Sequence, residues 1–299
     1  MSSYYSMQND LKVWIFACRP KTLTAVIVPV LMGTVIASSY VHLNMWIAIC
    51  TFISAIFIQI GTNLANDYFD YKKGADSQER LGPKRYTGSE LTTDKIKLGV
   101  IVSFAIAVVF GFILLFQGGW PIFWIGVLSL IFGVMYTGGP FPLGYNGLGE
   151  LFVFVFFGPV AVGGTFYLQT YNYNPFVFFI GFSPGLLSAA ILVINNLRDI
   201  KTDKNVNKKT LAVKFGADFA IKEYIYLILF ASIIPIILGI LCLSHWPITA
   251  SGIINFILFI PLIKRVKNGE RGRGLNSILA LTSFRLLIFG IIFCLFWLL

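Results

Sequence analysis

The 299-residue chain is 57% hydrophobic and only 12% charged, and it has a formal net charge of +10. Soluble domains are roughly 45–50% apolar and about 25% charged, so the composition excludes an ordinary water-soluble domain. We expect a lipid bilayer, and not nucleic acid, as the partner of this basic chain, because anionic lipid attracts basic segments at one membrane surface.

Apolar runs of about 20 residues, long enough to cross roughly 30 Å of hydrocarbon, recur along the chain. They predict nine transmembrane helices at residues 22–40, 45–66, 93–116, 121–137, 149–168, 175–196, 222–243, 246–264 and 276–297. The predicted fold class is therefore an all-α, polytopic membrane bundle, with residues 1–299 forming one domain. Charged residues interrupt the first apolar run at Asp10, Lys12 and Arg19, so we expect no cleavable signal peptide.

Charge placement predicts the orientation of these helices. All 23 Lys and Arg residues except Arg285 lie in the N-terminal segment or in and beside the links that follow predicted spans 2, 6 and 8. Every Asp and Glu lies on that same side. The positive-inside rule then places the N-terminus in the cytoplasm and the C-terminus on the opposite side of the cell (inner) membrane. Arg285, inside span 9, is expected to face the bundle interior or to reach toward the cytoplasm.

Asparagines and aspartates gather at the cytoplasmic ends of spans 2 and 6. The members are Asn63, Asn66, Asp70 and Asp76 at the first end, and Asn195, Asp199 and Asp203 at the second. Helical spacing aligns most of each set along one face, and the shared pattern predicts two facing halves of one site. Oxygen ligands of this kind favour Mg²⁺, which binds one or two carboxylates together with substrate phosphates. The predicted metal ligands are Asn66, Asp70, Asp76, Asp199 and Asp203.

Basic side chains are interleaved with these acidic clusters, namely Lys72, Lys73, Arg198 and Lys201. Such cations would neutralise phosphate charge that the metal leaves over. Together the two clusters predict an active site at the cytoplasmic side for an anionic, phosphorylated, lipid-soluble substrate. The alternative reading is that these residues are solvated helix ends with capping Asn and Asp.

The clusters resemble the two motifs of the UbiA family of intramembrane aromatic prenyltransferases. Asn66 and Asp70 match the first two letters of the family's NxxxDxxxD motif, and Asp199 with Asp203 matches its DxxxD motif. The third letter of the first motif falls on Gly74, and the next aspartate is Asp76. This KGAD variant is similar to the 1,4-dihydroxy-2-naphthoate polyprenyltransferase branch. Segments RLGPKR and TLAVKFG and residues 136–164 resemble the same branch.

The resemblance implies a Mg²⁺-dependent transfer of a polyprenyl group from polyprenyl diphosphate to an aromatic naphthoate acceptor. Loss of CO2 would give demethylmenaquinol, an intermediate of menaquinone biosynthesis. Asp70, Asp199, Asn66 and Tyr136 are the implied catalytic residues. Substrate binding is expected of Lys72, Lys73, Arg198, Lys201, Asn63, Asn195 and Arg19. An allylic cation would be shielded by Tyr68, Phe69 and Tyr136, and the acceptor's carboxylate would meet Arg19, Lys21, Lys84 or Arg85.

Two alternatives remain open from the sequence. A prenyltransferase could use another acceptor, such as 4-hydroxybenzoate, a porphyrin or a glycerol phosphate. A cation-coupled transporter could also carry intramembrane Asn and Asp, although transporters place such sites near the bilayer midplane. The glycine-rich segment 138–149 lacks the GK[ST] ending of a phosphate-binding loop, so we expect a close-packed re-entrant connection there instead.

Overall fold

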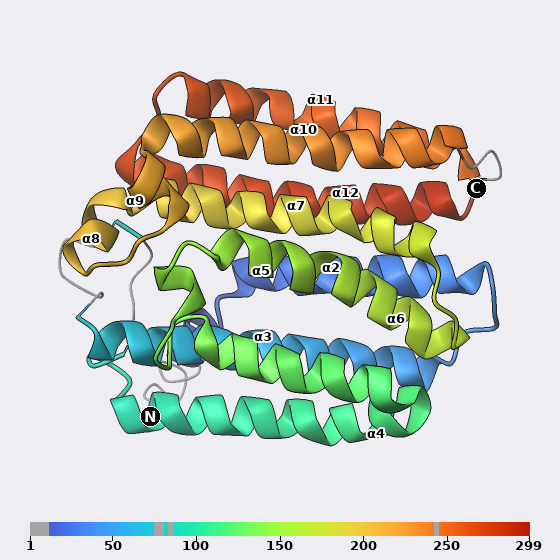
Figure 1. The fold of residues 1–299 in the computed structure, drawn as a ribbon, viewed down its shortest axis with the longest axis horizontal. Helices are drawn as coiled ribbons and strands as arrows, with labels where there is room; N and C mark the ends of the chain where they lie inside the picture. The colour runs from blue at the N-terminus through green and yellow to red at the C-terminus, as the bar shows by residue number, and fades with distance from the viewer. Residues whose placement is uncertain (1–11, 75–80, 83–86, 242–244) are drawn as a thin grey trace, which may run out of the picture.

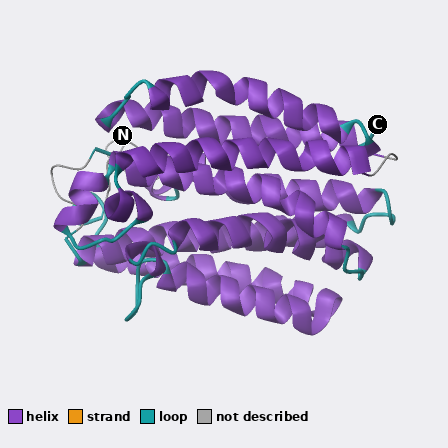
Figure 2. Ribbon diagram, turned by 45° about the horizontal axis from the view of Figure 1, so that its top comes forward, coloured by secondary structure: helices purple, strands orange, loops and turns teal. Residues whose placement is uncertain are grey.

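In a computed structural model the described residues are 12–74, 81–82, 87–241 and 245–299. Within these ranges the chain is helical, apart from loops and one isolated bridge between Thr87 and Leu91 (Figure 2). The all-α prediction is therefore confirmed. The elements in chain order are α2 (Pro20–Ser38), α3 (Met45–Lys72), α4 (Thr93–Met135), η1 (Leu143–Tyr145), α5 (Gly149–Val155), η2 (Phe156–Val160), α6 (Ala161–Thr170), α7 (Pro175–Arg198), α8 (Ile200–Asn205), α9 (Leu211–Phe215), α10 (Ala217–Leu241), α11 (Ile248–Lys267), η4 (Gly272–Gly274) and α12 (Leu275–Trp297).

Eight helical segments in the described ranges are long and apolar enough to cross a membrane. One of them, α4, has 43 residues, about 65 Å of helix at 1.5 Å per residue, or twice the thickness of the hydrocarbon core. At Gly119 its backbone leaves helical geometry (φ 63°, ψ −152°), and the chain doubles back (Figure 1). This hairpin accounts for two of the nine predicted spans. The protein is a multi-pass integral membrane protein.

Local sequence explains where several helices begin. Asn44 caps α3 by accepting a hydrogen bond from the Ile47 amide, and Asn174 caps α7 in the same way through the Phe176 amide. Thr92 caps α4 through the amide of Lys95. These side chains satisfy amide groups that a helix N-terminus leaves without partners.

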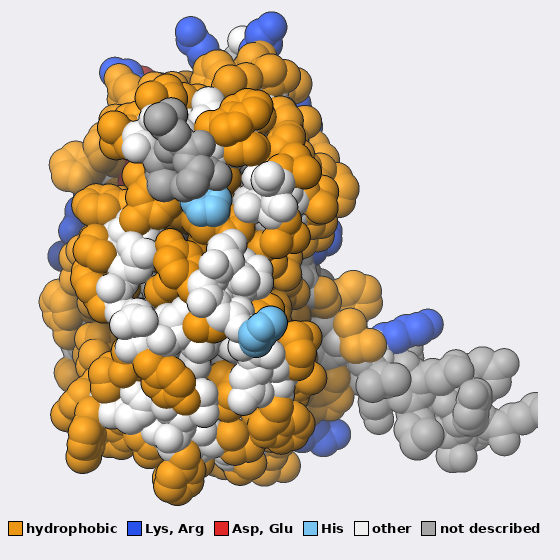
Figure 3. All heavy atoms as spheres, turned by 90° about the vertical axis from the view of Figure 1, so that its right-hand side faces the viewer, with side chains coloured by type: hydrophobic (Ala, Val, Ile, Leu, Met, Phe, Trp, Pro, Cys, Tyr) orange, Lys and Arg blue, Asp and Glu red, His pale blue; other side chains and the backbone are white. Residues whose placement is uncertain are grey.

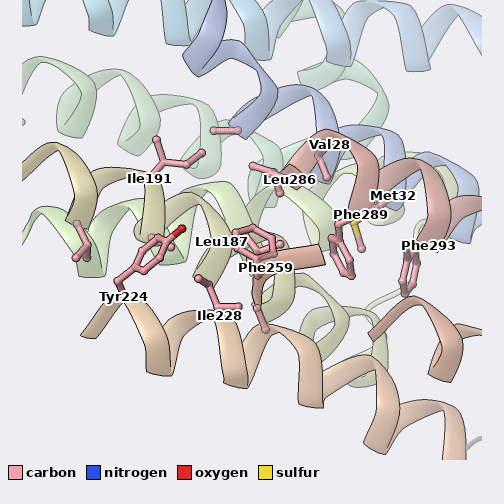
Figure 4. Close-up of a cluster of buried hydrophobic side chains, with 14 of the residues drawn as sticks. Val28, Met32, Leu187, Ile191, Tyr224, Ile228, Phe259, Leu286, Phe289 and Phe293 are labelled. Atoms are coloured by element: carbon pink, nitrogen blue, oxygen red, sulfur yellow. The ribbon is translucent and has the colours of Figure 1, made fainter. Parts of the chain in front are cut away.

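The apolar core lies mainly among α2, α6, α7, α10, α11 and α12. Figure 4 shows its centre, where Tyr224 and Ile228 of α10 face Leu187 and Ile191 of α7, beside Phe259 of α11. Helices α3 and α4 pack through two smaller, separate clusters. The bundle is therefore layered, with a large core on one side and helices α3 and α4 on the other (Figure 1).

Glycines allow α7 to pack directly on the irregular segment η2. A Cβ on Gly185 would lie 2.5 Å from the carbonyl oxygen of Phe154 and 2.9 Å from the Cα of Gly158. Small residues at such positions let helix backbones approach closely in membranes. The turn at η2 joins α5 and α6 into one bent membrane span, and its packing on α7 positions the N-terminus of α5.

The two ends of the bundle differ in charge. One end carries α8, α9, the C-terminal end of α3 and the start of α4, whereas the C-terminus of the chain lies at the other (Figure 1). Figure 3 views that second end: hydrophobic and uncharged polar side chains with the two histidines cover its middle, and Lys and Arg appear at its rim. This separation agrees with the charge asymmetry of the sequence, while the orientation relative to the cytoplasm stays a prediction.

Candidate active site

Most of the first predicted cluster lies near the C-terminal end of α3, which continues beyond the predicted span end at residue 66 to Lys72. Asn66 and Asp70 are both buried there, and Asp70 is only 6% exposed. The Asn66 Oδ1 accepts a hydrogen bond from the Thr137 hydroxyl at 2.8 Å. The Asp70 Oδ1 accepts one from the Tyr145 hydroxyl at 2.9 Å. Both acceptors are thus oriented by the connection that follows α4.

Two other predicted residues of this region fasten the N-terminal part of the chain to α3. The Asn63 amide donates to the Cys18 carbonyl and to the Thr22 hydroxyl, each at 3.1 Å. Arg19 forms an ion pair with Asp67 of α3. The guanidinium proposed for the acceptor's carboxylate is therefore already engaged by a buried aspartate.

The second predicted cluster is organised by Arg198, the last residue of α7. Its Nε and Nη2 donate to the two carboxylate oxygens of Asp199 at 2.8 and 2.5 Å. The remaining contacts are to Asn195 Oδ1 at 2.7 Å and to Asn276 Oδ1 of α12 at 2.8 Å. Arg198 is buried and spends its donors on protein groups, so it holds Asp199 in place.

The helical stripe expected from Asn195 to Asp203 is interrupted in the structure. Helix α7 ends at Arg198, Asp199 lies between helices with φ −98° and ψ 11°, and the short helix α8 begins at Ile200. Asp203 follows on α8. A break immediately after the Arg198 side chain lets the guanidinium fold back onto the neighbouring Asp199 carboxylate.

Asp203 has a carboxylate oxygen available for a ligand. One oxygen lies 3.3 Å from the Lys208 ammonium, whereas the buried Oδ2 has no hydrogen-bond partner among the described residues. Burial raises the pKa of Asp203 to about 6; Lys208 opposes the rise, and the charges of Asp199 and Asp70 add to it. The two predicted clusters are therefore close enough to act on each other electrostatically.

Tyr145 joins the two clusters physically. The Lys73 ammonium lies 4.2 Å from the centroid of its ring and the Lys208 ammonium 5.6 Å, while its hydroxyl contacts Asp70. Burial lowers the pKa of Lys208, but attraction to Asp203 and then to Asp70 more than offsets this, so the pKa is raised. Burial lowers the pKa of Lys73, whose ammonium also donates to the Thr137 carbonyl at 2.6 Å.

Several predicted residues lie outside this centre. Lys72 projects over the ring of Tyr68 at 4.5 Å, and Lys201 is exposed. Phe69 packs against the backbone of Gly138. The Arg285 guanidinium lies 5.7 Å from the ring centroid of Phe259. Three of the predicted residues, Asp76, Lys84 and Arg85, lie outside the described residues.

An apolar cavity of about 380 Å³ lies beside the polar centre. Its walls come from α2, both arms of α4, the middle of α3 and the α5–η2–α6 span, and Tyr136 is part of its lining. Of the three aromatic residues expected to shield a cation, only Tyr136 lines this cavity. Tyr136 also lies within electrostatic reach of Asp70 and Asp203, so it connects the cavity with the carboxylates.

The polar centre has the chemistry of a site for a divalent cation. In the described part of the chain no three acidic, His or Cys side chains come together as a ready-made metal cluster. Mg²⁺ does not require one, because it usually keeps waters and substrate phosphate oxygens among its ligands. The unpartnered oxygen of Asp203, close to Asp70 and Asp199, fits such a ligand set.

Sequence reasoning missed Tyr145, Lys208, Thr137 and Glu150 as parts of this region. Glu150 Oε1 accepts a hydrogen bond from Asn196 at 2.7 Å, which places a further carboxylate beside the centre. Tyr145 and Glu150 were visible only as members of the glycine-rich connection and its flank. Lys208 was visible only as one of many basic residues in the link after span 6. Nothing in their local spacing distinguishes them from their neighbours.

The carboxylates of this group are buried, Lys208 is half-buried and Lys73 is exposed, and an apolar cavity lies beside them within a multi-pass bundle. Such an arrangement is typical of a membrane enzyme and suits an amphiphile with an anionic head. The chain belongs to the UbiA prenyltransferase family, which matches it over residues 26–285. It is 36% identical over 281 residues to the 1,4-dihydroxy-2-naphthoate octaprenyltransferase of Mycobacterium tuberculosis, covering 93% of this chain and 94% of that protein. The protein of the same name from Haemophilus influenzae is 32% identical, with 99% and 98% covered.

Solved structures of the family share the fold. An apo UbiA homolog from Aeropyrum pernix superposes with a TM-score of 0.69 at 14% identity, covering 91% of this chain and 96% of that one. A UbiA homolog from Archaeoglobus fulgidus bound to GPP and Mg²⁺ has a TM-score of 0.65 at 14% identity, with 94% and 99% covered. The predicted family and the helical membrane fold are confirmed.

Proposed function

We propose that the protein transfers a polyprenyl group from polyprenyl diphosphate to 1,4-dihydroxy-2-naphthoate, with decarboxylation, to give demethylmenaquinol. The observation that carries the proposal is the Tyr145 contact set, which links Asp70 to Lys73 and Lys208 next to the apolar cavity. The names of the two bacterial relatives support the choice of acceptor. We further propose that the reaction takes place at the cytoplasmic side of the cell membrane.

The acidic residues would hold Mg²⁺ against the diphosphate. The proposed ligands are Asn66, Asp70, Asp76, Asp199 and Asp203. Bound there, Mg²⁺ supplies positive charge that stabilises the departing diphosphate. Arg198 contacts both oxygens of Asp199, and Tyr145 contacts the Oδ1 of Asp70, so each carboxylate is held in one orientation.

The chain's own cations would bind the rest of the diphosphate charge. Lys73 and Lys208 both lie near one tyrosine ring, so two ammonium groups are held on the same side chain, one of them also paired with Asp203. Charge-assisted hydrogen bonds from such groups are about twice as strong as neutral ones. As the allylic carbon–oxygen bond breaks, the electron pair goes to the diphosphate, where these lysines lower its energy.

The apolar cavity would hold the isoprenoid tail and keep water from the allylic cation. Tyr136 stands at the junction of cavity and carboxylates, where its ring face could stabilise positive charge by about 0.5–2 kcal/mol. The electron-rich naphthol ring then attacks the cation, and the ring carboxylate leaves as CO2. We assign the binding of that carboxylate to Lys21 at the α2 N-terminus, because the neighbouring Arg19 is paired with Asp67.

An acceptor screen tests this proposal. Membranes containing the protein are incubated with labelled farnesyl diphosphate and with 1,4-dihydroxy-2-naphthoate, 4-hydroxybenzoate, a porphyrin or glycerol phosphate, each with and without a chelator. We expect prenylated product and CO2 release with the naphthoate alone, and only when Mg²⁺ is present. Product from another acceptor would replace the proposed one, and substrate flux across sealed vesicles without any product would favour a transporter.

Two variants test the metal ligands in the same assay. Asp70→Ala and Asp199→Ala are each expected to abolish turnover while the protein still inserts into the membrane. Asp218→Asn, which changes a carboxylate in the first turn of α10, is the matched control and should keep its rate. Wild-type turnover of either alanine variant at limiting Mg²⁺ would remove the metal assignment.

A further inference from the structure

Glu150 is a buried carboxylate that the reaction described so far does not use. It is the second residue of α5 and is 7% exposed. Its Oε1 accepts a hydrogen bond from the side-chain amide of Asn196, which is also buried, at 2.7 Å. The other oxygen, Oε2, is buried and has no hydrogen-bond partner within the described ranges. A buried acceptor without a donor carries a desolvation penalty that nothing offsets, so this oxygen calls for a partner that the described residues do not supply.

The position of Glu150 points to a substrate as that partner. A Cβ on the preceding Gly149 would lie 3.0 Å from the Tyr136 hydroxyl, so the start of α5 packs directly on the residue that joins cavity and carboxylates. Glu150 and Tyr136 lie within electrostatic reach of each other. Lys208 and Lys214 also act on Glu150, and on α10 the carboxylate of Glu223 lies within electrostatic reach of Glu150.

We propose that Glu150 accepts the hydroxyl proton of the acceptor ring while the new carbon–carbon bond forms, with Asn196 as the residue that positions it. This inference rests on the proposed function. Asn196 donates to one oxygen and thereby leaves the other as a pure acceptor, which suits an incoming O–H group. The geometry is that of a general base oriented by a second group.

The proton and electron count closes in each turnover. The ring carbon next to the hydroxyl, which bears the carboxylate, bonds to the allylic carbon, while the allylic carbon–oxygen bond breaks and its pair leaves with the diphosphate. The hydroxyl proton passes to Glu150 and the ring oxygen becomes a ketone. The bond to the carboxylate then breaks, CO2 leaves, and its electron pair restores the aromatic ring. The ring oxygen takes the proton back from Glu150, so no external acid or base is consumed.

Glu150→Gln is the direct test, because the amide oxygen can still accept the hydrogen bond from Asn196 but cannot take a proton. With saturating farnesyl diphosphate and 1,4-dihydroxy-2-naphthoate, kcat should fall roughly 10²- to 10⁴-fold, as for loss of a general base. The KM for the diphosphate should change by less than about threefold, because binding and proton transfer are separable. Glu223→Gln is the matched control: its carboxylate also has a buried, unpartnered oxygen, and its kcat should stay within about threefold of wild type.

Two chemical tests separate proton transfer from a structural role. Added formate should restore part of the turnover of Glu150→Ala, since a small carboxylate can occupy the space left by the side chain. A halogenated naphthoate, whose hydroxyl ionises more readily, should lose less rate in Glu150→Gln than the parent acceptor does.

Distinct results decide the outcome. A Glu150→Gln protein whose kcat stays within threefold of wild type overturns the assignment of Glu150 as the base. The assignment is also overturned if both Glu150 variants lose Mg²⁺-dependent diphosphate binding and formate restores no turnover. A wild-type protein that makes no naphthoate product instead overturns the proposed function itself.

Discussion

Substitution of Tyr145 by Phe removes the hydroxyl that contacts Asp70 and keeps the ring that faces Lys73 and Lys208. That hydroxyl donates to the buried Asp70 at 2.9 Å, and a hydrogen bond to a charged group contributes about 1.5–3 kcal/mol. At about 1.4 kcal/mol per factor of ten, kcat/KM should fall roughly 10- to 150-fold. A loss of 10- to 100-fold is also typical when an outer-shell partner of a metal ligand is removed.

A second substitution resolves the contribution of the ring. Tyr145→Phe keeps an aromatic face under Lys73 and Lys208, whereas Tyr145→Leu removes it. The two cation–π contacts, at 4.2 and 5.6 Å, are each worth about 0.5–2 kcal/mol, so the leucine variant should lose at least about a further fivefold. The assay is prenyl transfer as a function of Mg²⁺ and diphosphate concentration, with Tyr171→Phe, exposed at the far end of α6, as control. If Tyr145→Phe has wild-type kcat/KM at every Mg²⁺ concentration, the reasoning that Tyr145 orients Asp70 is wrong.

Three further predictions concern the metal site, the cavity and the packing. Burial raises the pKa of Asp203 from 3.8 to about 6, so ionisation of this carboxyl destabilises the fold increasingly as the pH rises through that interval. With chelator present, the melting temperature of the protein should therefore increase as the pH is lowered from 7 to 5. The Asp203→Asn variant should not show this increase. Gly126 lines the cavity, and the space where its Cβ would be is open. Gly126→Leu should therefore shift the products toward shorter prenyl chains when diphosphates of different lengths compete, whereas Ala105→Leu on the exposed face of α4 should not. An unchanged chain length in Gly126→Leu would exclude this cavity as the site of the prenyl tail. In Gly185→Ala the new methyl group would clash with the Phe154 carbonyl oxygen and the Gly158 backbone. This overpacking should cost about 1–3 kcal/mol and lower the melting temperature, without altering the dependence of the activity on metal.

The membrane architecture could be predicted because it depends on patterns that are local in the sequence. Apolar length identified each span, and the Gly119 reversal falls between the two spans predicted from residues 93–116 and 121–137. The second membrane span was predicted to end at residue 66, whereas the helical spacing of Asn66 and Asp70 required helix α3 to run further. Buried partners such as Thr137 and Tyr145 allow polar residues to continue it to Lys72.

The partners within the site could not be predicted from spacing. Charge type suggested Arg198 and Arg19 as binders of anionic substrate, yet each is paired with an aspartate of the protein itself. Those pairings depend on where α7 stops and on how α2 packs against α3. Tyr145, Lys208 and Glu150 reach the centre only through tertiary contacts made by the connections after α4 and α8. Pattern analysis located the two helix ends, and packing decides which side chains meet there.

The separation between the large core and the layer of helices α3 and α4 has a consequence for which substitutions this protein can accept. The large cluster of buried apolar side chains lies among α2, α6, α7, α10, α11 and α12, while many of the walls of the cavity belong to α3 and α4. Side chains facing the cavity can therefore be exchanged with little penalty to the rest of the bundle. Selection for a different lipid tail could proceed on one layer while the other keeps the molecule folded, so tail preference and thermal tolerance should vary independently among variants of this chain.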